Sequence, residues 1–239
     1  MRGDLRALVF DLDDTLIRTY DDLIVPLERE AARLMLQYRA EERQQESGGA
    51  ARPELPDCET LAETLLHYRR SDPAGLRGAV GRQVPQLGAG AWEAREKLFR
   101  NPSVSALRRM PGVRRMLDEL RLHYRLFLLT HGFADFQQRK LDKSGLGRYF
   151  DGVRMVARSR EKGEALAALG PALRLQPAEI GVIGNRLDVE IRMGLALGCF
   201  TVWVRSGEGS EMPVGQAGGR PHEVVEDLSV LAGLLGCKG

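Results

Sequence analysis

Residues 8–16 read LVFDLDDTL, and this stretch decides the fold. Its first three residues are apolar, as in a buried strand, and two aspartates, Asp11 and Asp13, follow where the run breaks into polar residues. Because side chains alternate along a strand, Asp11 and Asp13 face the same way. Two carboxylates held this close repel each other unless a cation lies between them or one of them keeps a proton. The stretch therefore predicts a reactive site at the end of a strand.

The composition fits one full domain plus a smaller one. The chain has 239 residues, 43% of them hydrophobic and 6% aromatic. Its 35 Lys and Arg residues nearly balance 33 Asp and Glu residues, for a formal net charge of +2. This balance predicts no strongly basic surface, so we expect no nucleic-acid partner.

Three cysteines, Cys58, Cys199 and Cys237, are widely spaced and include no Cys-x-x-Cys pair. This pattern predicts free thiols in a reducing compartment rather than a disulfide framework or a zinc site. Acidic residues interrupt the first apolar run before a signal peptide could form, and no stretch approaches the length of a membrane span. We therefore expect a cytoplasmic protein with no membrane partner. The sequence does not give the oligomeric state.

A long helical segment follows the two aspartates. Residues 26–43 place apolar side chains at helical spacing, a Gly-rich break follows at 47–53, and Asp57 is a candidate N-cap for the next helix. Further helix is expected up to about residue 100, most clearly over 91–99. Residues 18–103 are therefore predicted to form an all-helical insert.

From residue 104 onward, strand patterns alternate with helix patterns. The predicted strands are residues 125–130, 153–156, 180–185, 200–204 and 223–225. Helices between strands imply right-handed crossovers and a parallel sheet covered on both faces. We predict an α/β fold, with a doubly wound, Rossmann-like parallel sheet as the core (1–17 and 104–239) and an inserted all-helical domain (18–103). The Gly-rich residues 207–221 predict a mobile loop.

Several of the predicted strands end in polar residues. Thr130 ends one strand and Asn185 ends another, as Asp11 and Asp13 end the first. In open α/β sheets, ligands bind beyond the carboxyl ends of the strands. These side chains are therefore expected to converge on one site.

Four motifs, taken in order, resemble those of the haloacid dehalogenase superfamily. They are residues 11–16 (DLDDTL), the turn Thr130-His131-Gly132, Lys162, and residues 184–190 (GNRLDVE). In that family a doubly wound core carries a cap, and a helical cap lies between the first and second motifs, where the helical insert lies here. The resemblance extends over essentially the whole chain.

The resemblance implies roles for the two aspartates. Asp11 corresponds to the nucleophile that forms an aspartyl-phosphate, a covalent step that divides a hard hydrolysis into two displacements. Asp13 corresponds to the general acid/base, which protonates the leaving alcohol and later activates water. Proximity to Asp11 is expected to raise the proton affinity of Asp13. Without the other motifs, either residue would read as a loop or N-cap aspartate.

The second and third motifs imply a phosphate site. Thr130 corresponds to the hydroxyl that holds the phosphoryl group, together with the turn formed by His131 and Gly132 and a helix beginning near residue 133. Lys162 corresponds to the lysine that offsets negative charge on the nucleophile and the phosphate. The alternatives are a threonine that merely ends a strand, an incidental loop histidine and a solvated surface lysine.

The fourth motif departs from the family pattern. The family has Asp after the glycine, as a magnesium ligand, and a second Asp further on, whereas this chain has Asn185 and Glu190. We expect Mg²⁺ as the cofactor, held by a set drawn from Asp11, Asp13, Asn185, Asp188 and Glu190. An amide oxygen can meet a hard cation but adds no charge, so binding is expected to be weaker. Asp188 is alternatively an N-cap for the helix that starts at residue 189.

Asp13 favours phosphoryl transfer, because the dehalogenase branch of the family releases a halide that needs no proton. We predict a hydrolase, a magnesium-dependent phosphatase of a small phosphorylated metabolite. A phosphotransferase or mutase on the same site, a 2-haloacid dehalogenase and a non-catalytic binding relative with a weakened metal site are the alternatives. A phospho-receiver domain ranks last, because it has no need of the helical insert. The sequence does not identify the substrate.

Overall fold

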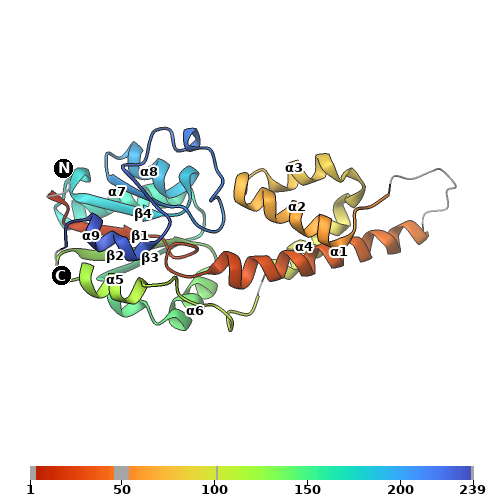
Figure 1. The fold of residues 1–239 in the computed structure, drawn as a ribbon, viewed down its shortest axis with the longest axis horizontal. Helices are drawn as coiled ribbons and strands as arrows, with labels where there is room; N and C mark the ends of the chain where they lie inside the picture. The colour runs from red at the N-terminus through yellow and green to blue at the C-terminus, as the bar shows by residue number, and fades with distance from the viewer. Residues whose placement is uncertain (1–3, 46–53, 101, 238–239) are drawn as a thin grey trace.

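A computed structural model describes residues 4–45, 54–100 and 102–237 (Figure 1). These residues form a six-stranded sheet in the order β3-β2-β1-β4-β5-β6, and every neighbouring pair is parallel. The strands are β1 (Ala7–Phe10), β2 (Arg125–His131), β3 (Gly152–Val156), β4 (Ile180–Gly184), β5 (Phe200–Val204) and β6 (Glu223–Val225). The predicted doubly wound parallel sheet is confirmed.

The central strand β1 lies between β2 and β4, with Ala7 opposite both Arg125 and Ile180. From β1 the chain builds outward through β2 to β3, and it then returns to add β4 on the other side of β1. The strand order therefore reverses between β1 and β4. Ligands of open α/β sheets bind at such a point, beyond the carboxyl ends of the strands. Asp11, the residue after β1, lies there.

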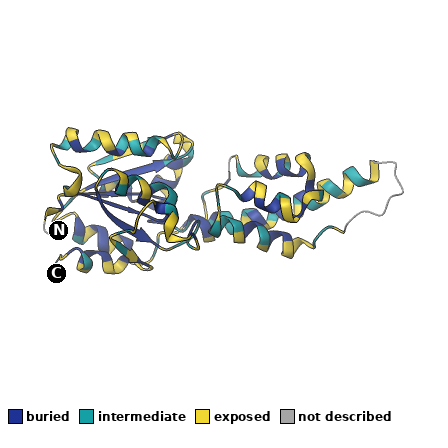
Figure 2. Ribbon diagram, turned by 90° about the horizontal axis from the view of Figure 1, so that it is seen from above, coloured by how far each residue is buried: buried dark blue, intermediate teal, exposed yellow. Residues whose placement is uncertain are grey.

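Alternate residues of β1 pack against helices on opposite faces of the sheet. Leu8 and Phe10 join one apolar cluster with α5, α6 and α9, whereas Ala7 and Val9 join another with α7 and α8. The helices are α5 (Val113–Leu120), α6 (Ala134–Ser144), α7 (Glu161–Leu173), α8 (Arg192–Ala196) and α9 (Leu231–Leu234). Figure 2 shows the buried strands between the two helical layers.

A second body of helices follows β1 and lies beside the sheet (Figure 1). After a π-helical turn (Tyr20–Ile24) come α1 (Val25–Gln45), α2 (Cys58–Ser71), α3 (Leu76–Gln83) and α4 (Gly88–Phe99). They share an apolar cluster of their own that includes Ala32, Met35, Leu61, Leu65 and Trp92. Asp57 caps α2 as expected, because its side chain accepts a 2.8 Å hydrogen bond from the backbone N–H of Thr60. The break predicted at 47–53 lies outside the described residues.

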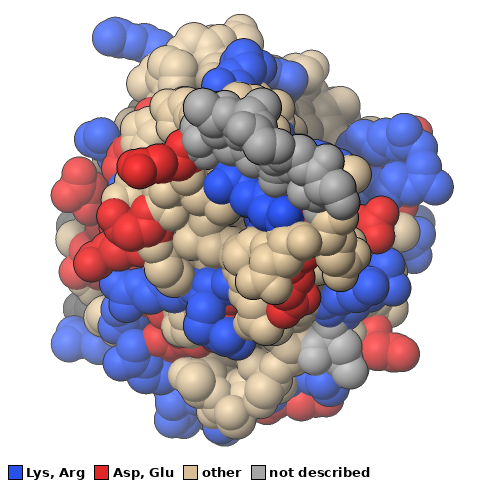
Figure 3. All heavy atoms as spheres, turned by 90° about the vertical axis from the view of Figure 1, so that its right-hand side faces the viewer, with Lys and Arg blue, Asp and Glu red and all other residues tan. Residues whose placement is uncertain are grey.

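The surface follows the balanced composition. On the face shown in Figure 3, Lys and Arg side chains are interspersed with Asp and Glu.

The three cysteines are free thiols, as the sequence predicts. Among the helices of the described residues, none is both long and apolar enough for a membrane crossing.

Candidate active site

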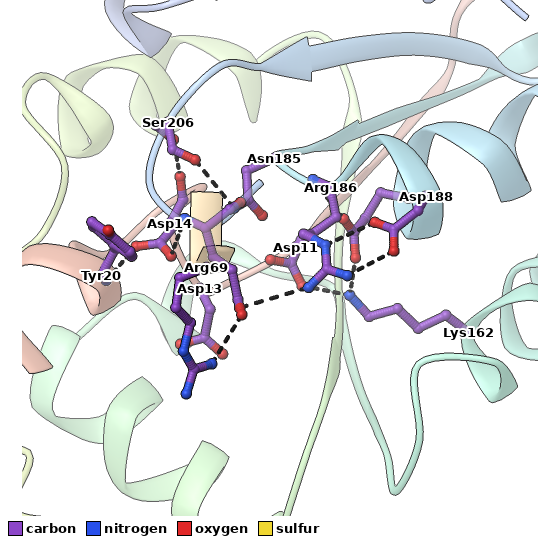
Figure 4. A network of polar contacts seen from close by, with 12 residues as sticks. Asp11, Asp13, Asp14, Tyr20, Arg69, Lys162, Asn185, Arg186, Asp188 and Ser206 are labelled. Carbon is purple, nitrogen blue, oxygen red and sulfur yellow. Dashed lines mark hydrogen bonds and ion pairs between the residues drawn. The ribbon is translucent and has the colours of Figure 1, made fainter. Parts of the chain in front are cut away.

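The nucleophile candidate, Asp11, lies in a buried chain of charges at the carboxyl end of β1 (Figure 4). Lys162, in the first turn of α7, donates a 2.6 Å hydrogen bond from Nζ to Oδ1 of Asp11. The same Nζ donates to Oε1 of Glu190, at 2.5 Å. All three side chains are at most 5% exposed. The predicted surface alternative for Lys162 is therefore excluded.

This burial shifts the proton affinities within the chain of charges. Burial raises the pKa of Asp11 to about 7, against the opposing effect of Lys162 and with smaller contributions from Glu190 and Asp13. Burial alone would lower the pKa of Lys162, but its two carboxylate partners outweigh burial and raise it. Lys162 therefore stays charged, and an additional cation near Asp11 would favour the ionised carboxylate.

Asp13 is held by different partners. Its Oδ1 accepts hydrogen bonds from Nζ of Lys140, at 2.7 Å, and from Oγ1 of Thr19, at 2.5 Å. Its Oδ2 accepts from Nε2 of Gln137, at 2.9 Å. Burial alone would raise the pKa of Asp13, but Lys140 and these hydrogen bonds outweigh it, so the pKa lies below its ordinary value. The expectation that nearness to Asp11 raises the proton affinity of Asp13 is wrong for this arrangement.

The sequence analysis did not identify Lys140 and Gln137 as site residues. Both lie on α6. Their spacing of three residues places them on one face of the helix, and both are buried. The sequence signal for these two site residues is that they are polar and lie on the face of the helix that packs against the core.

The second motif, residues 130–132, lies next to Asp13 at the end of β2. Thr130 is fully buried at the end of β2, and its Oγ1 accepts a 3.0 Å hydrogen bond from Nε2 of Gln137. Gly132 adopts a φ of +135°, a conformation that favours glycine, and its N–H donates to the carbonyl of Val156 at 2.9 Å. Burial and then the charge of Lys162 lower the pKa of His131. Helix α6 begins at Ala134, as expected.

Asn185 secures a loop of the core. Its Nδ2 donates to the carbonyl oxygens of Glu208, at 2.9 Å, and Ser206, at 3.3 Å, and Nε1 of Trp203 donates to its backbone carbonyl at 2.8 Å. A carboxylate could not donate these bonds and would repel both carbonyls. This gives a physical reason for an amide at this position. The side-chain oxygen of Asn185 is the atom left for a cation.

The other acidic residues of the fourth motif have basic partners. Arg186 donates from Nε and Nη2 to the two carboxylate oxygens of Asp188, at 2.8 and 2.7 Å. Glu190, besides binding Lys162, accepts a 3.1 Å hydrogen bond from the backbone N–H of Arg186. The alternative of Asp188 as an N-cap is wrong, because Asp188 lies inside a π-helical turn (Leu187–Ile191) whose N-cap residue is Arg186.

The donors at the strand ends fit a hard cation only sparsely. Within the described ranges, no group of three or more His, Cys, Asp and Glu residues is arranged to hold a metal ion. The carboxylate of Asp11 and the amide oxygen of Asn185 are nevertheless the oxygen ligands that magnesium prefers. Asp188 and Glu190 are turned to Arg186 and Lys162, and both carboxylate oxygens of Asp13 accept hydrogen bonds from other side chains. Of the five expected ligands, Asp11 and Asn185 therefore remain as the candidates.

The first part of the Gly-rich loop after β5 is docked rather than free. The backbone N–H groups of Gly209 and Glu211 donate to the carbonyls of Arg69 and Arg70, both at 3.2 Å. These carbonyls belong to the last turn of α2, which has no partners for them within the helix. The expectation of a mobile loop over 207–221 therefore does not describe this part, since its hydrogen bonds join the core to the helical body.

Comparison with known proteins gives the family. A model of the haloacid dehalogenase-like hydrolases matches residues 5–198. N-acylneuraminate-9-phosphatase of Homo sapiens is 26% identical over 242 residues, or 97% of this chain and 94% of that protein. The Rattus norvegicus protein of the same name is 30% identical, but that match spans 52% of this chain and only 50% of the rat protein.

A solved structure, that of the HAD-hydrolase YfnB from Bacillus subtilis, described as bound to magnesium, has the same fold. It superposes with a TM-score of 0.58 at 18% identity and covers 97% of this chain and 99% of its own. The family match, the sheet topology and the curated phosphatase relatives agree with one another. This chain belongs to the haloacid dehalogenase-like hydrolases.

Proposed function

We propose that the protein is a phosphatase that hydrolyses a small phosphorylated metabolite through an aspartyl-phosphate on Asp11. The observation that carries this proposal is the buried chain in which Lys162 holds Asp11 at 2.6 Å and is itself held by Glu190. A carboxylate placed at the switch point of the sheet is available to attack phosphorus. Lys162 offsets the negative charge that gathers when a phosphate approaches it.

The reaction then has two displacements. In the first, a carboxylate oxygen of Asp11 bonds to phosphorus, the ester P–O bond breaks, and Asp13 gives a proton to the leaving alkoxide. In the second, water attacks the same phosphorus, Asp13 takes a proton from the water, and Asp11 leaves. Without substrate, Lys140 holds Asp13 ionised, which is the form that accepts a proton from water in the second displacement. The first displacement needs the protonated form, so Asp13 must take up a proton as the negatively charged substrate phosphate approaches. The proton that Asp13 then takes from water restores this form for the next turnover.

The phosphoryl group would be held by the second motif. The hydroxyl of Thr130 and the turn at His131 and Gly132 border the site, and the amino-terminal end of α6 follows directly. The N–H groups at the start of a helix favour an anion. These residues therefore orient the phosphate without taking part in bond breaking.

Magnesium is the cation that we propose for this site. The oxygens of Asp11 and Asn185 would hold it, and the ion would supply positive charge against the nucleophile and the phosphate. The magnesium-bound relative of the same fold and the hard oxygen donors support this assignment. Because Asn185 contributes no charge, we expect weaker binding than with two carboxylates.

Hydrolysis of a generic aryl phosphate at increasing magnesium concentration tests the proposal. Wild-type protein should release phosphate in a magnesium-dependent manner, and the Asp11→Asn variant should not. A folded wild-type protein with no activity at high magnesium would instead support a binding relative. Phosphoryl transfer to an added alcohol in preference to water would support a phosphotransferase. A screen of phosphorylated metabolites, with the same variant as the blank, would then identify the substrate.

A further inference from the structure

A glutamate on the core loop bridges an arginine of the helical body and an arginine of the core. Oε1 of Glu208 accepts a 3.0 Å hydrogen bond from Nη1 of Arg69, at the end of α2. Its Oε2 lies 3.6 Å from Nη1 of Arg186, the residue after Asn185 at the end of β4. Arg69 and Arg186 belong to the network of polar contacts drawn in Figure 4, which also contains Asp11 and Asp13. The carboxylate of Glu208 therefore lies between the helical body and Arg186, which directly follows the candidate metal ligand Asn185.

Arg69 belongs to a cluster with one surplus positive charge. It donates from Nε to Oε1 of Glu28 at 2.8 Å, and Arg95 donates from its own Nε to Oε2 of the same Glu28, also at 2.8 Å. Glu28 is fully buried, so two arginines share one buried carboxylate. Both guanidinium groups also lie over the ring of Phe99, at 5.1 and 4.6 Å, which fixes their positions. Glu208 supplies the missing negative charge from the other body.

Arg186 does not need Glu208 in the same way. Its two-bond pair with Asp188 already balances its charge. Its longer 3.6 Å contact with Glu208 places a second guanidinium group beside this carboxylate. At this junction between the helical body and the core, two guanidinium groups therefore face one carboxylate.

The side chain of Glu208 can leave this junction while its backbone stays in place. Its N–H donates to Oδ2 of Asp14 at 3.2 Å, and its carbonyl accepts from Nδ2 of Asn185 at 2.9 Å. The preceding Gly207 has a φ of +56°, and any side chain there would collide with Asp14. Only side-chain rotation is therefore needed to release Arg69.

We propose that Arg69, together with Arg186, binds a carboxylate of the substrate, and that this carboxylate displaces the side chain of Glu208. The substrate class is then a phosphomonoester that also carries a carboxylate group. A carboxylate fits the planar fork of arginine and restores the single charge that the cluster of Glu28, Arg69 and Arg95 lacks. A second phosphate would bring more charge than the cluster can balance. This inference rests on the phosphatase function proposed above.

The test uses matched substrates. Phosphate esters of hydroxy acids of increasing chain length are compared with their neutral amides, and kcat/KM is measured for each pair. At the best length, wild-type protein should prefer the acid by about ten- to a hundred-fold, the range expected for a hydrogen bond to a charged group. Arg69→Gln should bring the ratio close to one, mainly through KM for the acid. Arg69→Lys keeps the charge without the fork and should retain part of the preference.

Arg70→Gln is the control for a merely structural role. Arg70 lies in the last turn of the same helix and donates a 2.8 Å hydrogen bond to a core-loop glutamate, Glu211, so it joins the two bodies in a similar way. This variant should keep the acid-to-amide ratio of wild type. Glu208→Gln should raise the ratio, because it removes the competing carboxylate from Arg69.

Two results would overturn the inference. One is an acid-to-amide ratio near one for wild type at every chain length. The other is an equal loss on acids and amides in both Arg69→Gln and Arg70→Gln, which would make Arg69 only a link between the bodies. Either result leaves the phosphatase function intact as long as phenyl phosphate is hydrolysed. Absence of hydrolysis of every phosphomonoester would instead contradict the phosphatase function itself.

Discussion

Nζ of Lys162 lies 2.6 Å from Oδ1 of Asp11, and neither side chain is appreciably exposed to solvent. Glu190 binds the other side of the same ammonium group. One ammonium group is thus shared by two buried carboxylates. Burial raises the pKa of Asp11, and Lys162 compensates the negative charge of Asp11 only in part because it also binds Glu190. A second cation beside Asp11 would therefore favour the ionised carboxylate, which is the form that attacks phosphorus.

Removal of the lysine should affect stability and activity separately. Lys162→Met leaves Asp11 and Glu190 buried without a cation, so we expect the free energy of unfolding to fall by about 3–5 kcal/mol. The double variant Lys162→Met/Glu190→Gln should regain part of that stability, because one charge fewer is buried, but none of the phosphatase activity. Urea unfolding and aryl phosphate turnover measure the two effects. Full activity in the folded double variant would contradict a catalytic role for Lys162.

The pH profile of hydrolysis should show the titration of Asp11. Only the ionised carboxylate attacks phosphorus, so kcat/KM should rise with pH through the raised pKa of Asp11. Magnesium favours the ionised form, and we therefore expect this acidic limb to move to lower pH as magnesium is raised. The profile is measured at limiting and at saturating magnesium. A limb that stays in place, or moves to higher pH, would show that Asp11 and the metal do not interact.

Lys140 should make stability sensitive to acid through Asp13. Since the pKa of Asp13 is lower in the folded protein than its ordinary value, this contribution is complete above about pH 4. It is lost as the pH falls further, through the folded pKa. Lys140→Met should therefore lower the free energy of unfolding near pH 7 by about 3 kcal/mol, with the difference from wild type shrinking at acid pH.

Lys143→Met is the matched control for Lys140→Met, because Lys143 lies on the same helix but is exposed. It should leave the unfolding free energy nearly unchanged across the pH range. Urea unfolding of both variants between neutral and acid pH measures the effect. A constant difference between Lys140→Met and wild type at all pH values would exclude the Asp13 linkage.

Asn185→Asp should have two opposed effects. A carboxylate adds charge beside Asp11, so the magnesium concentration for half-maximal activity should fall. The same change removes the hydrogen bonds to the carbonyls of Ser206 and Glu208, so the free energy of unfolding should fall by about 1–3 kcal/mol. Magnesium titration of activity and urea unfolding measure the two effects. An unchanged magnesium requirement and turnover would contradict the assignment of Asn185 as a weak ligand.

The sheet could be predicted because its strands carry local signals. The predicted strand at 200–204 agrees with β5 (Phe200–Val204), and β6 also has its predicted bounds. Parallel strands joined by helices allow few topologies, so the convergence of Asp11, Thr130 and Asn185 at the strand ends followed from sequence order.

The contacts that tune the site could not be predicted in this way. Lys140 reaches Asp13 across 127 positions of sequence, and no local pattern marks the partner of a lysine. The Gly-rich loop resembles a mobile segment until the last carbonyls of α2 provide acceptors for Gly209 and Glu211. Both depend on how the packed elements meet, and this was visible only in the structure.

The most direct measurement is chemical trapping of the phosphorylated nucleophile. The Asp13→Asn variant is mixed with an aryl phosphate whose leaving group departs without a proton, so the first displacement proceeds while the second lacks its base. Borohydride quenching then reduces an aspartyl-phosphate to homoserine, which peptide mass spectrometry locates. We predict homoserine at position 11, and none in Asp11→Asn or without substrate. Aryl alcohol release with no reduced residue at position 11 would contradict Asp11 as the nucleophile.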